Sequence, residues 1–189
     1  MAQRRHHYDQ AFEKYLRERR IPYVAVNEAR RALFGGDGPA LRATDEAGAT
    51  RSLKSFDFVI YGPERNLLLE VKGRKIAYGA STTARLESWV TMDDVSGLER
   101  WERLFGEGFE AALAFLYWCE APPPDGLFQE MVEHRGRWYA VRAVRVSEYA
   151  RHMVVRSPRW RTVHVPGEAF VRISQPLSGA MRSGEGGVP

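Results

Sequence analysis

The sequence predicts an α/β fold in which a mixed β-sheet carries one helix on each side, and three observations support this. Segments 8–20 and 91–107 have the apolar periodicity of amphipathic helices. Between them, residues 56–61 and 67–72 are two β-prone runs separated by turn residues. The nearly continuous apolar run at 109–118 is typical of a central strand covered on both faces.

The first helix is predicted from a single apolar stripe. Its members recur at spacings of three and four and are Tyr8, Phe12, Tyr15 and Leu16. Asp9 lies near the start of this segment and Pro22 follows its end, placements that favour helix entry and exit. A short edge strand is expected at 23–26, followed by one or two helical turns at 27–34.

The two β-prone runs are expected to pair as a hairpin. If residues 62–65 form the loop, Tyr61 pairs with Asn66. Continuing that register backwards sets Asp57 opposite Glu70, with Cα atoms about 4.5 to 5.5 Å apart.

Side-chain alternation decides which residues of the hairpin share a face. One face of the first strand is expected to carry Asp57, Val59 and Tyr61, and the opposite face Phe56, Phe58 and Ile60. Glu70 and Lys72 share a face of the second strand. The hairpin thus brings two carboxylates and an ammonium to one side of the sheet.

This trio predicts a metal site for cutting phosphodiesters. Opposed like charges destabilise a sheet by up to about 1 kcal/mol, and a divalent cation between them reverses the sign. Mg²⁺ prefers carboxylate oxygens. The Lys72 ammonium can orient the attacking water and offset charge on the phosphorus. The alternative is a solvent-facing hairpin with an ordinary Glu70–Lys72 ion pair.

The pattern of Asp57, twelve intervening residues and then Glu70-Val71-Lys72 resembles the PD-(D/E)XK nuclease superfamily, which includes many restriction endonucleases and Holliday junction resolvases. Phe56 replaces the usual preceding Pro. The order helix, hairpin, helix, strand extends the resemblance over roughly the first 120 residues. The resemblance implies a restriction endonuclease-like core, to which this chain adds C-terminal strands.

The resemblance also implies roles for the motif residues. Asp57 and Glu70 would bind Mg²⁺, or Mn²⁺, through their side chains, and Val71 would add its backbone carbonyl. Lys72 would serve the water. The first helix of the superfamily sometimes carries a further acidic ligand, for which Glu13 is the candidate here.

Glu13 has a competing interpretation, because it can pair with Arg17 one helical turn later. Arg74, Lys75 and Arg85, which follow the motif, are the candidates for substrate binding. Residues 76–88 lack a clear period and are expected to form a loop over the site, or a surface excursion without a role.

The C-terminal half is rich in arginine. Between residues 135 and 161 the basic side chains are Arg135, Arg137, Arg142, Arg145, Arg151, Arg156, Arg159 and Arg161, against Glu148 alone on the acidic side. Tryptophans and tyrosines interleave with them, which suits phosphate contact and base stacking. A solvated surface explains the pattern equally well. Further strands are expected at 161–165 and 169–173.

Composition bounds the class of protein. With 189 residues, 44% of them hydrophobic, the chain is long enough for one core, expected over residues 1–177 with a flexible tail at 178–189. No apolar run reaches the ~20 residues of a membrane helix and no signal peptide is expected, so the prediction is a cytoplasmic protein. Cys119 lies in an apolar run and is expected to be a buried, inert thiol. Zinc, P-loop and nucleophile-elbow motifs are absent from the sequence.

The sequence therefore predicts a magnesium-dependent nuclease that hydrolyses phosphodiester bonds in nucleic acid. DNA is preferred over RNA because the resembling families mostly cut DNA, and a homodimer is left open. One rival is a catalytically silent module on the same fold that binds nucleic acid or protein. A second is an interaction protein whose arginines only solubilise it.

Overall fold

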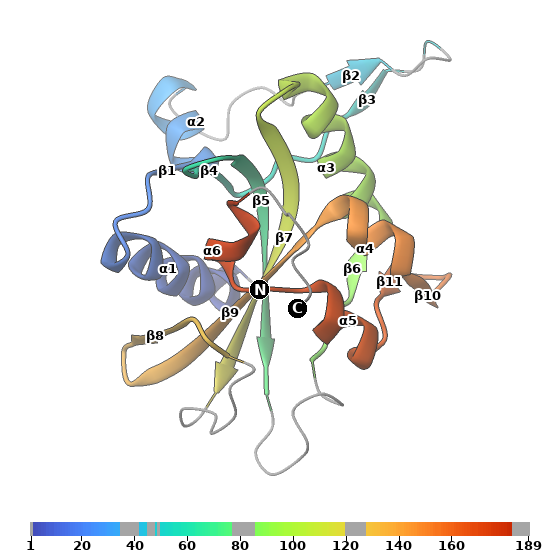
Figure 1. The fold of residues 1–189 in the computed structure, drawn as a ribbon. Helices are drawn as coiled ribbons and strands as arrows, with labels where there is room; N and C mark the ends of the chain where they lie inside the picture. The colour runs from blue at the N-terminus through green and yellow to red at the C-terminus, as the bar shows by residue number, and fades with distance from the viewer. Residues whose placement is uncertain are drawn as a thin grey trace.

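The computed structural model describes residues 2–34, 42–44, 48, 50–76, 86–119 and 128–182. Its centre is a six-stranded mixed sheet with the strand order β1-β4-β5-β7-β9-β8 (Figure 1). The strands are β1 (Tyr23–Ala25), β4 (Phe58–Tyr61), β5 (Asn66–Lys75), β7 (Phe109–Cys119), β8 (Met131–His134) and β9 (Arg137–Arg145). Strands β5 and β7 are parallel and the other neighbours are antiparallel.

Helices cover both faces of this sheet. The helices are α1 (Ala2–Glu18), α2 (Val26–Phe34), α3 (Met92–Phe105), α4 (Val146–His152), α5 (Gly167–Ile173) and α6 (Leu177–Ala180). Figure 1 shows α1 on one side and α3, α4 and α5 on the other. The predicted fold class, a mixed sheet flanked by helices, is confirmed.

Two small sheets complete the fold. Strands β10 (Val154–Ser157), β11 (Thr162–His164) and β6 (Val90–Thr91) pair antiparallel, and β6 leads directly into α3. Strands β2 (Arg42–Thr44) and β3 (Thr50–Ser52) form a hairpin away from the main sheet (Figure 1). The three-stranded sheet supplies the predicted extra strand at 161–165 and lies beside the entry to α3.

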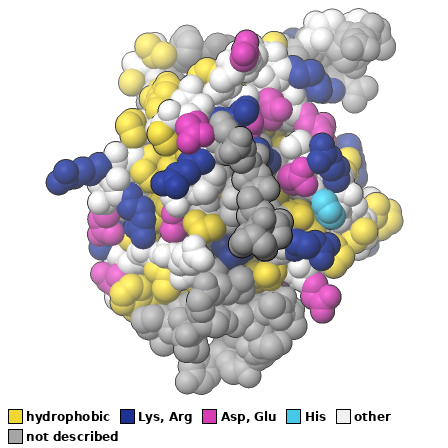
Figure 2. All heavy atoms as spheres, viewed as in Figure 1, with side chains coloured by type: hydrophobic (Ala, Val, Ile, Leu, Met, Phe, Trp, Pro, Cys, Tyr) yellow, Lys and Arg dark blue, Asp and Glu magenta, His cyan; other side chains and the backbone are white. Residues whose placement is uncertain are grey.

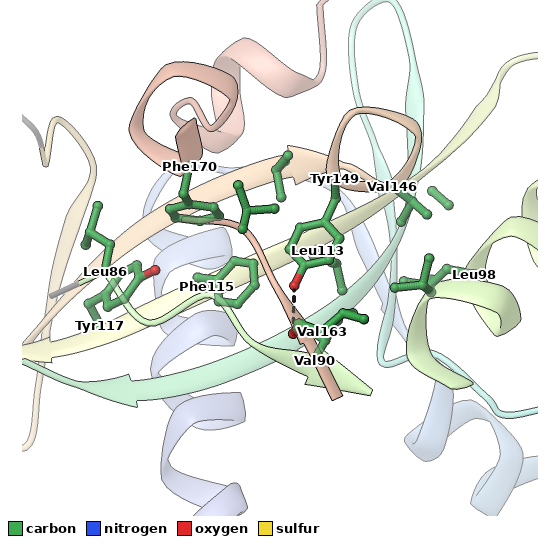
Figure 3. Packing of buried hydrophobic residues seen from close by; sticks show 14 of the residues in the cluster. Leu86, Val90, Leu98, Leu113, Phe115, Tyr117, Val146, Tyr149, Val163 and Phe170 are labelled. Atoms are coloured by element: carbon green, nitrogen blue, oxygen red, sulfur yellow. Dashed lines mark hydrogen bonds between the residues drawn. The ribbon is translucent and has the colours of Figure 1, made fainter. Parts of the chain in front are cut away.

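The core divides into one apolar cluster on each face of the main sheet. On the α1 face the stripe residues Phe12, Tyr15 and Leu16 are fully buried, as the sequence predicts. On the opposite face β7 and the small sheet meet α3, α4 and α5, with Phe115, Tyr149 and Phe170 packed together (Figure 3). The Tyr149 hydroxyl donates to the carbonyls of Ser88 at 2.7 Å and Val163 at 3.3 Å. These bonds tie the three-stranded sheet to the domain.

Three details differ from the sequence prediction. Residues 169–173 lie in helix α5 and not in a strand, because the chain turns into a helix after Pro166 and buries Phe170. Phe56 packs against Trp101 of α3 and not with Phe58 and Ile60, because β4 begins only at Phe58 and strand alternation stops there.

The third difference concerns the predicted tail. Helix α6 begins at Leu177, and the backbone N–H groups of Leu177 and Ser178 donate to the Glu130 carboxylate at 2.6 and 3.1 Å. Ala180 and Met181 are buried. Apolar spacing and a buried carboxylate therefore order the chain through residue 182, and residues 183–189 lie outside the described part. Within the described chain, no helix is both long and apolar enough to span a membrane.

Candidate active site

The candidate site lies at the N-terminal end of β4, beyond which β5 continues with β7 as its neighbouring strand. The predicted register is present, with Tyr61 paired to Asn66 and Phe58 to Leu69. Beyond the Phe58–Leu69 pair, a side chain replaces the backbone as hydrogen-bond acceptor for β5. The Val71 N–H donates to Asp57 Oδ2 at 2.8 Å. The hairpin therefore ends with Asp57 bonded to the edge of β5 next to Glu70.

Glu70 and Lys72 point to the α3 face of β5, and both are buried, with 6% and 8% of their surface exposed. Lys72 Nζ lies 2.7 Å from Glu70 Oε1. The same ammonium lies 3.0 Å from Asp94 Oδ1 at the start of α3. Burial distinguishes this ion pair from the exposed one that was the alternative interpretation of the hairpin.

Asp94 lies in the first turn of α3, where backbone and side-chain hydrogen bonds fix its carboxylate. It forms a capping box with Thr91: the Thr91 N–H donates to Asp94 Oδ2 at 2.9 Å and the Asp94 N–H donates to Thr91 Oγ1 at 3.1 Å. Its other oxygen pairs with Lys72 and Lys54. One carboxylate thus fixes the helix start and two lysines at once.

The two carboxyl groups respond to this environment in opposite directions. Burial, together with the charge of Asp57, raises the pKa of Glu70 from 4.5 to about 7, although Lys72 acts against the shift. Burial alone would raise the pKa of Asp94, but Lys72, Lys54 and the Thr91 backbone hold it at about 2. Glu70 is therefore the carboxylate whose charge an added cation would stabilise most.

These groups line one cavity of about 370 Å³. It is lined by Tyr8, Asp9, Asn27, Lys54, Asp57, Glu70, Val71, Lys72, Gly73, Arg74, Trp89, Val90, Thr91 and Asp94. Five of these, Asp57, Glu70, Val71, Lys72 and Arg74, are site residues predicted from the sequence. Lys54, Asn27 and Asp94 come from three other segments, and no spacing in the chain connects them to the hairpin.

The donor set suits a hard divalent cation. Carboxylates of Asp57 and Glu70 offer oxygen ligands next to each other, and the pKa of Glu70 is raised first by burial and second by the charge of Asp57. Within the described residues, no three His, Cys, Asp or Glu side chains converge as a ready-made metal cluster. Glu70 Oε1 instead accepts a hydrogen bond from the Lys72 ammonium.

Glu13, the weaker ligand candidate, does not line the cavity. Its carboxylate pairs with Arg17 and accepts a hydrogen bond from the Tyr23 hydroxyl at 3.3 Å. Asp9, one turn earlier on α1, lines the cavity in its place. The spacing of four residues puts both on one helix face, so the sequence carried a signal for Asp9 that its position near the helix start obscured.

The three substrate-binding candidates have different positions. Arg74 lines the cavity, donates to the Gly73 carbonyl at 2.8 Å and stacks on Trp89 with Cζ 4.1 Å from the ring centroid. Lys75 Nζ instead lies 4.5 Å over the Trp118 ring and does not line the cavity. Arg85, with most of the predicted loop at 76–88, lies outside the described residues.

The arginine-rich segment does not form one surface. Arg142 is buried and donates to Ser174 Oγ at 2.8 Å. Three others have separate carboxylate partners: Arg145 pairs with Glu110, Arg151 with Glu148 and Arg161 with Asp93. Figure 2 shows basic and acidic side chains interspersed on the viewed face. These four arginines therefore make contacts within the protein.

Comparisons with known proteins give a similarity in fold. No protein-family model matches the chain, and no curated protein matches it significantly. Among solved structures, the chain is similar to Archaeoglobus fulgidus Hjc, a Holliday junction resolvase from an archaeal hyperthermophile. The two share 17% sequence identity over 76% of this chain and 85% of that one, with a TM-score of 0.42.

Proposed function

We propose that this protein is a divalent-metal-dependent nuclease that hydrolyses phosphodiester bonds in nucleic acid, with DNA as the preferred substrate. The observation that carries the proposal is that Asp57 and the buried side chains of Glu70 and Lys72 line one cavity. A carboxyl group in a cavity with a raised pKa, as in Glu70, is typical of a site with a chemical task.

Each motif residue has a distinct part in the proposed reaction. Asp57 and Glu70 would hold Mg²⁺ or Mn²⁺, joined by the Val71 carbonyl. The bound ion would polarise the phosphoryl oxygens and favour ionisation of a water. Asp9 replaces Glu13 as the acidic side chain that α1 contributes to the cavity.

Lys72 is placed to handle the water because it has two carboxylate partners. When Glu70 Oε1 turns to a cation, the ammonium keeps Asp94 at 3.0 Å and stays in the cavity. From there it donates a hydrogen bond to the attacking water or to a phosphate oxygen. A fixed donor in a buried site stabilises charge that develops in the transition state without reorganising.

Arg74 is the proposed contact to the substrate backbone, because its guanidinium lines the same cavity. A planar guanidinium suits phosphate oxygens, which it can bind with two parallel hydrogen bonds. Lys75 and Arg85 remain predicted contacts farther along the strand and loop.

A cleavage assay with matched carboxylate variants tests the proposal. Labelled DNA and RNA are incubated with the protein in Mg²⁺, Mn²⁺ or EDTA. We expect cutting in Mg²⁺ or Mn²⁺, none in EDTA, and loss of cutting in Asp57→Asn. Glu13→Gln is the control, since Glu13 is a carboxylate on α1 outside the cavity, and it should cut like the wild type.

Two results would contradict the nuclease proposal. One is cutting that survives in Asp57→Asn with undiminished rate. The other is salt-dependent binding of nucleic acid without cutting under any metal condition, which would favour the catalytically silent module.

A further inference from the structure

Trp89 lines the candidate active site and contacts two guanidinium groups. Arg74 Cζ is 4.1 Å from the indole centroid and Arg156 Cζ is 5.2 Å from it. Arg74 comes from β5 and Arg156 from β10, so the stack joins the main sheet to the small one. We call these three residues the arginine–tryptophan stack.

Two cavities share Trp89 as a lining residue, and Arg74 lines the first and Arg156 the second. The second cavity, of about 300 Å³, is also lined by Ser88 and His164. Within the described chain, His164 Nδ1 is buried and has no hydrogen-bond partner. Glu87 also lines this cavity and accepts from the Trp89 Nε1–H at 3.2 Å. The second cavity thus offers a cation and an unused ring nitrogen.

Arg74 carries a charge that the described residues do not neutralise by contact. It is 9% exposed, and its guanidinium donates to the carbonyls of Gly73 and Trp89. No carboxylate among the described residues lies within ion-pair distance, and Arg74 Nε has no hydrogen-bond partner there. Burial lowers the pKa of Arg74, although Glu87 and nearby tyrosines act against the shift. A buried charge without a counter-ion is unfavourable, so an external anion would be stabilised here.

We propose that the arginine–tryptophan stack and the second cavity bind an unpaired nucleic-acid strand that leads away from the candidate active site. Arg74 and Arg156 contact successive phosphates, and one nucleobase enters the second cavity. The inference rests on the proposed function for the site at which the strand starts.

The size of the second cavity selects an unpaired strand. About 300 Å³ is at the lower end of the range for small-molecule pockets, which suits one nucleobase. A base in such a cavity cannot remain in a duplex, and leaving the stack costs least when it is already unpaired. Guanidinium groups and aromatic rings hold single strands with little sequence preference.

Binding without catalysis tests the inference. Fluorescence anisotropy is measured in EDTA with a labelled 12-nucleotide single strand, as DNA and as RNA, and with the matching duplex. The variants are Arg156→Ala and Trp89→Leu. Arg159→Ala is the matched control, because Arg159 is also exposed and stacked on an indole, with Cζ 5.4 Å from the Trp160 centroid, but lines neither cavity.

We expect Arg156→Ala and Trp89→Leu to weaken single-strand binding roughly tenfold. Arg156→Ala should also reduce the salt slope of log K by about 0.7. Arg159→Ala should stay within about twofold of wild type, and duplex binding should change little in any variant. The DNA and RNA arms tell which unpaired strand is preferred. Thermal unfolding checks that Trp89→Leu folds. Because Arg156 is exposed, Arg156→Ala is not expected to disturb folding.

Equal losses in Arg159→Ala and Arg156→Ala would overturn the inference, because general charge would then explain binding. Equal losses for duplex and single strand would do so too. Wild-type cleavage in Mg²⁺ is measured separately. Selective single-strand binding without cutting would support the strand site while removing the nuclease proposal.

Discussion

The two halves of strand β5 differ sharply although they belong to one continuous strand. In the first half, Leu67, Leu68 and Leu69 are fully buried between the two apolar clusters and paired with β4. In the second half, Glu70 and Lys72 are nearly as buried but charged, and β4 has ended. The same strand therefore serves as core in one half and as candidate site in the other.

The difference comes from where the neighbouring strand stops. Without β4 beside it, the Val71 N–H bonds to the Asp57 side chain instead of a backbone carbonyl. The chain there leaves room for a cavity between α1, β5 and α3. Buried charge is tolerated only with partners, and the Lys72 pairs with Glu70 and Asp94 supply them. We expect substitutions in the first half to affect stability and those in the second to affect chemistry.

The largest expected effect is on cleavage by Glu70→Gln. The change removes a proposed metal ligand but keeps the shape of the side chain, and Lys72 retains Asp94 as a partner. We expect the cleavage rate to fall about 10²- to 10³-fold or more, with little change in unfolding free energy. Single-turnover kinetics and urea denaturation measure the two quantities.

Glu130→Gln is a useful control for Glu70→Gln. Glu130 is equally buried at 6% exposure, but its carboxylate accepts backbone N–H groups of α6, away from the cavity. Glu130→Gln should lower the free energy of unfolding, whereas the cleavage rate per folded molecule should stay unchanged. Cleavage that is insensitive to Glu70→Gln would remove the distinction between the two halves of β5.

The opposite pattern is expected for Leu68→Ala in the first half. Leu68 is fully buried and packs in the cluster on the α3 face. Truncating a buried leucine costs about 2 to 5 kcal/mol of unfolding free energy. Urea denaturation should detect this loss, whereas the cleavage rate per folded molecule should change by less than tenfold. A larger fall in that rate would mean that core and site are not separable along β5.

The sequence predicted the hairpin and its register because turn chemistry and strand alternation are local properties. Asp57, Glu70 and Lys72 could be grouped for that reason. Asp94 could not be grouped with them, since its place depends on how α3 docks on β5, a contact between distant segments. Its capping role, which is local, was predictable.

The wrong prediction of a strand at 169–173 and the choice of Glu13 over Asp9 have the same origin. Residues 169–173 are β-prone, but burial of Phe170 against the sheet favours a helix over local propensity. Glu13 was chosen because the resemblance implies an acidic ligand on the first helix, but the cavity lies beside the middle of α1, where Asp9 lines it. Packing decides which turn of a helix lies against a given part of the sheet. The local sequence pattern therefore predicts which face of the helix is buried but not which of its turns reaches the cavity.

Gly73 tests how tightly α1 closes the second half of β5. A Cβ at this position would lie well inside contact distance of three ring atoms of Tyr8. We expect Gly73→Ala to cost about 1 to 3 kcal/mol, because the Tyr8 ring must move, and to displace the neighbouring Asp9 from the cavity. Thermal unfolding and the cleavage rate should both fall.

Gly97→Ala is the matched control in α3. Its Cβ would meet Lys54 Cβ at 3.6 Å, an ordinary contact, and alanine in a helix interior is stabilising by up to about 1 kcal/mol. If Gly73→Ala behaves like Gly97→Ala, the Tyr8 contact does not constrain the site.

The smallest expected effect links pH to metal binding in the second half of β5. Because the folded-state pKa of Glu70 is raised to about 7, its contribution to stability is present below pH 4.5 and lost as pH rises through about 7. A proton and a cation compete for this carboxylate, so Mg²⁺ affinity should fall by up to about tenfold per pH unit below 7. The pKa of Asp94, at about 2, keeps it ionised throughout this range.

Thermal unfolding with and without Mg²⁺ at pH 5.5 and pH 8 measures this competition. Ligand that binds only the folded state raises its stability, so Mg²⁺ should raise Tm more at pH 8 than at pH 5.5. Leu68→Ala should keep that pH dependence at a lower Tm, and Glu70→Gln should abolish it. A Mg²⁺ effect that is equal at both pH values, or equal in wild type and Glu70→Gln, would mean that Glu70 does not hold the ion, because protonation of a ligand must compete with the metal that it binds.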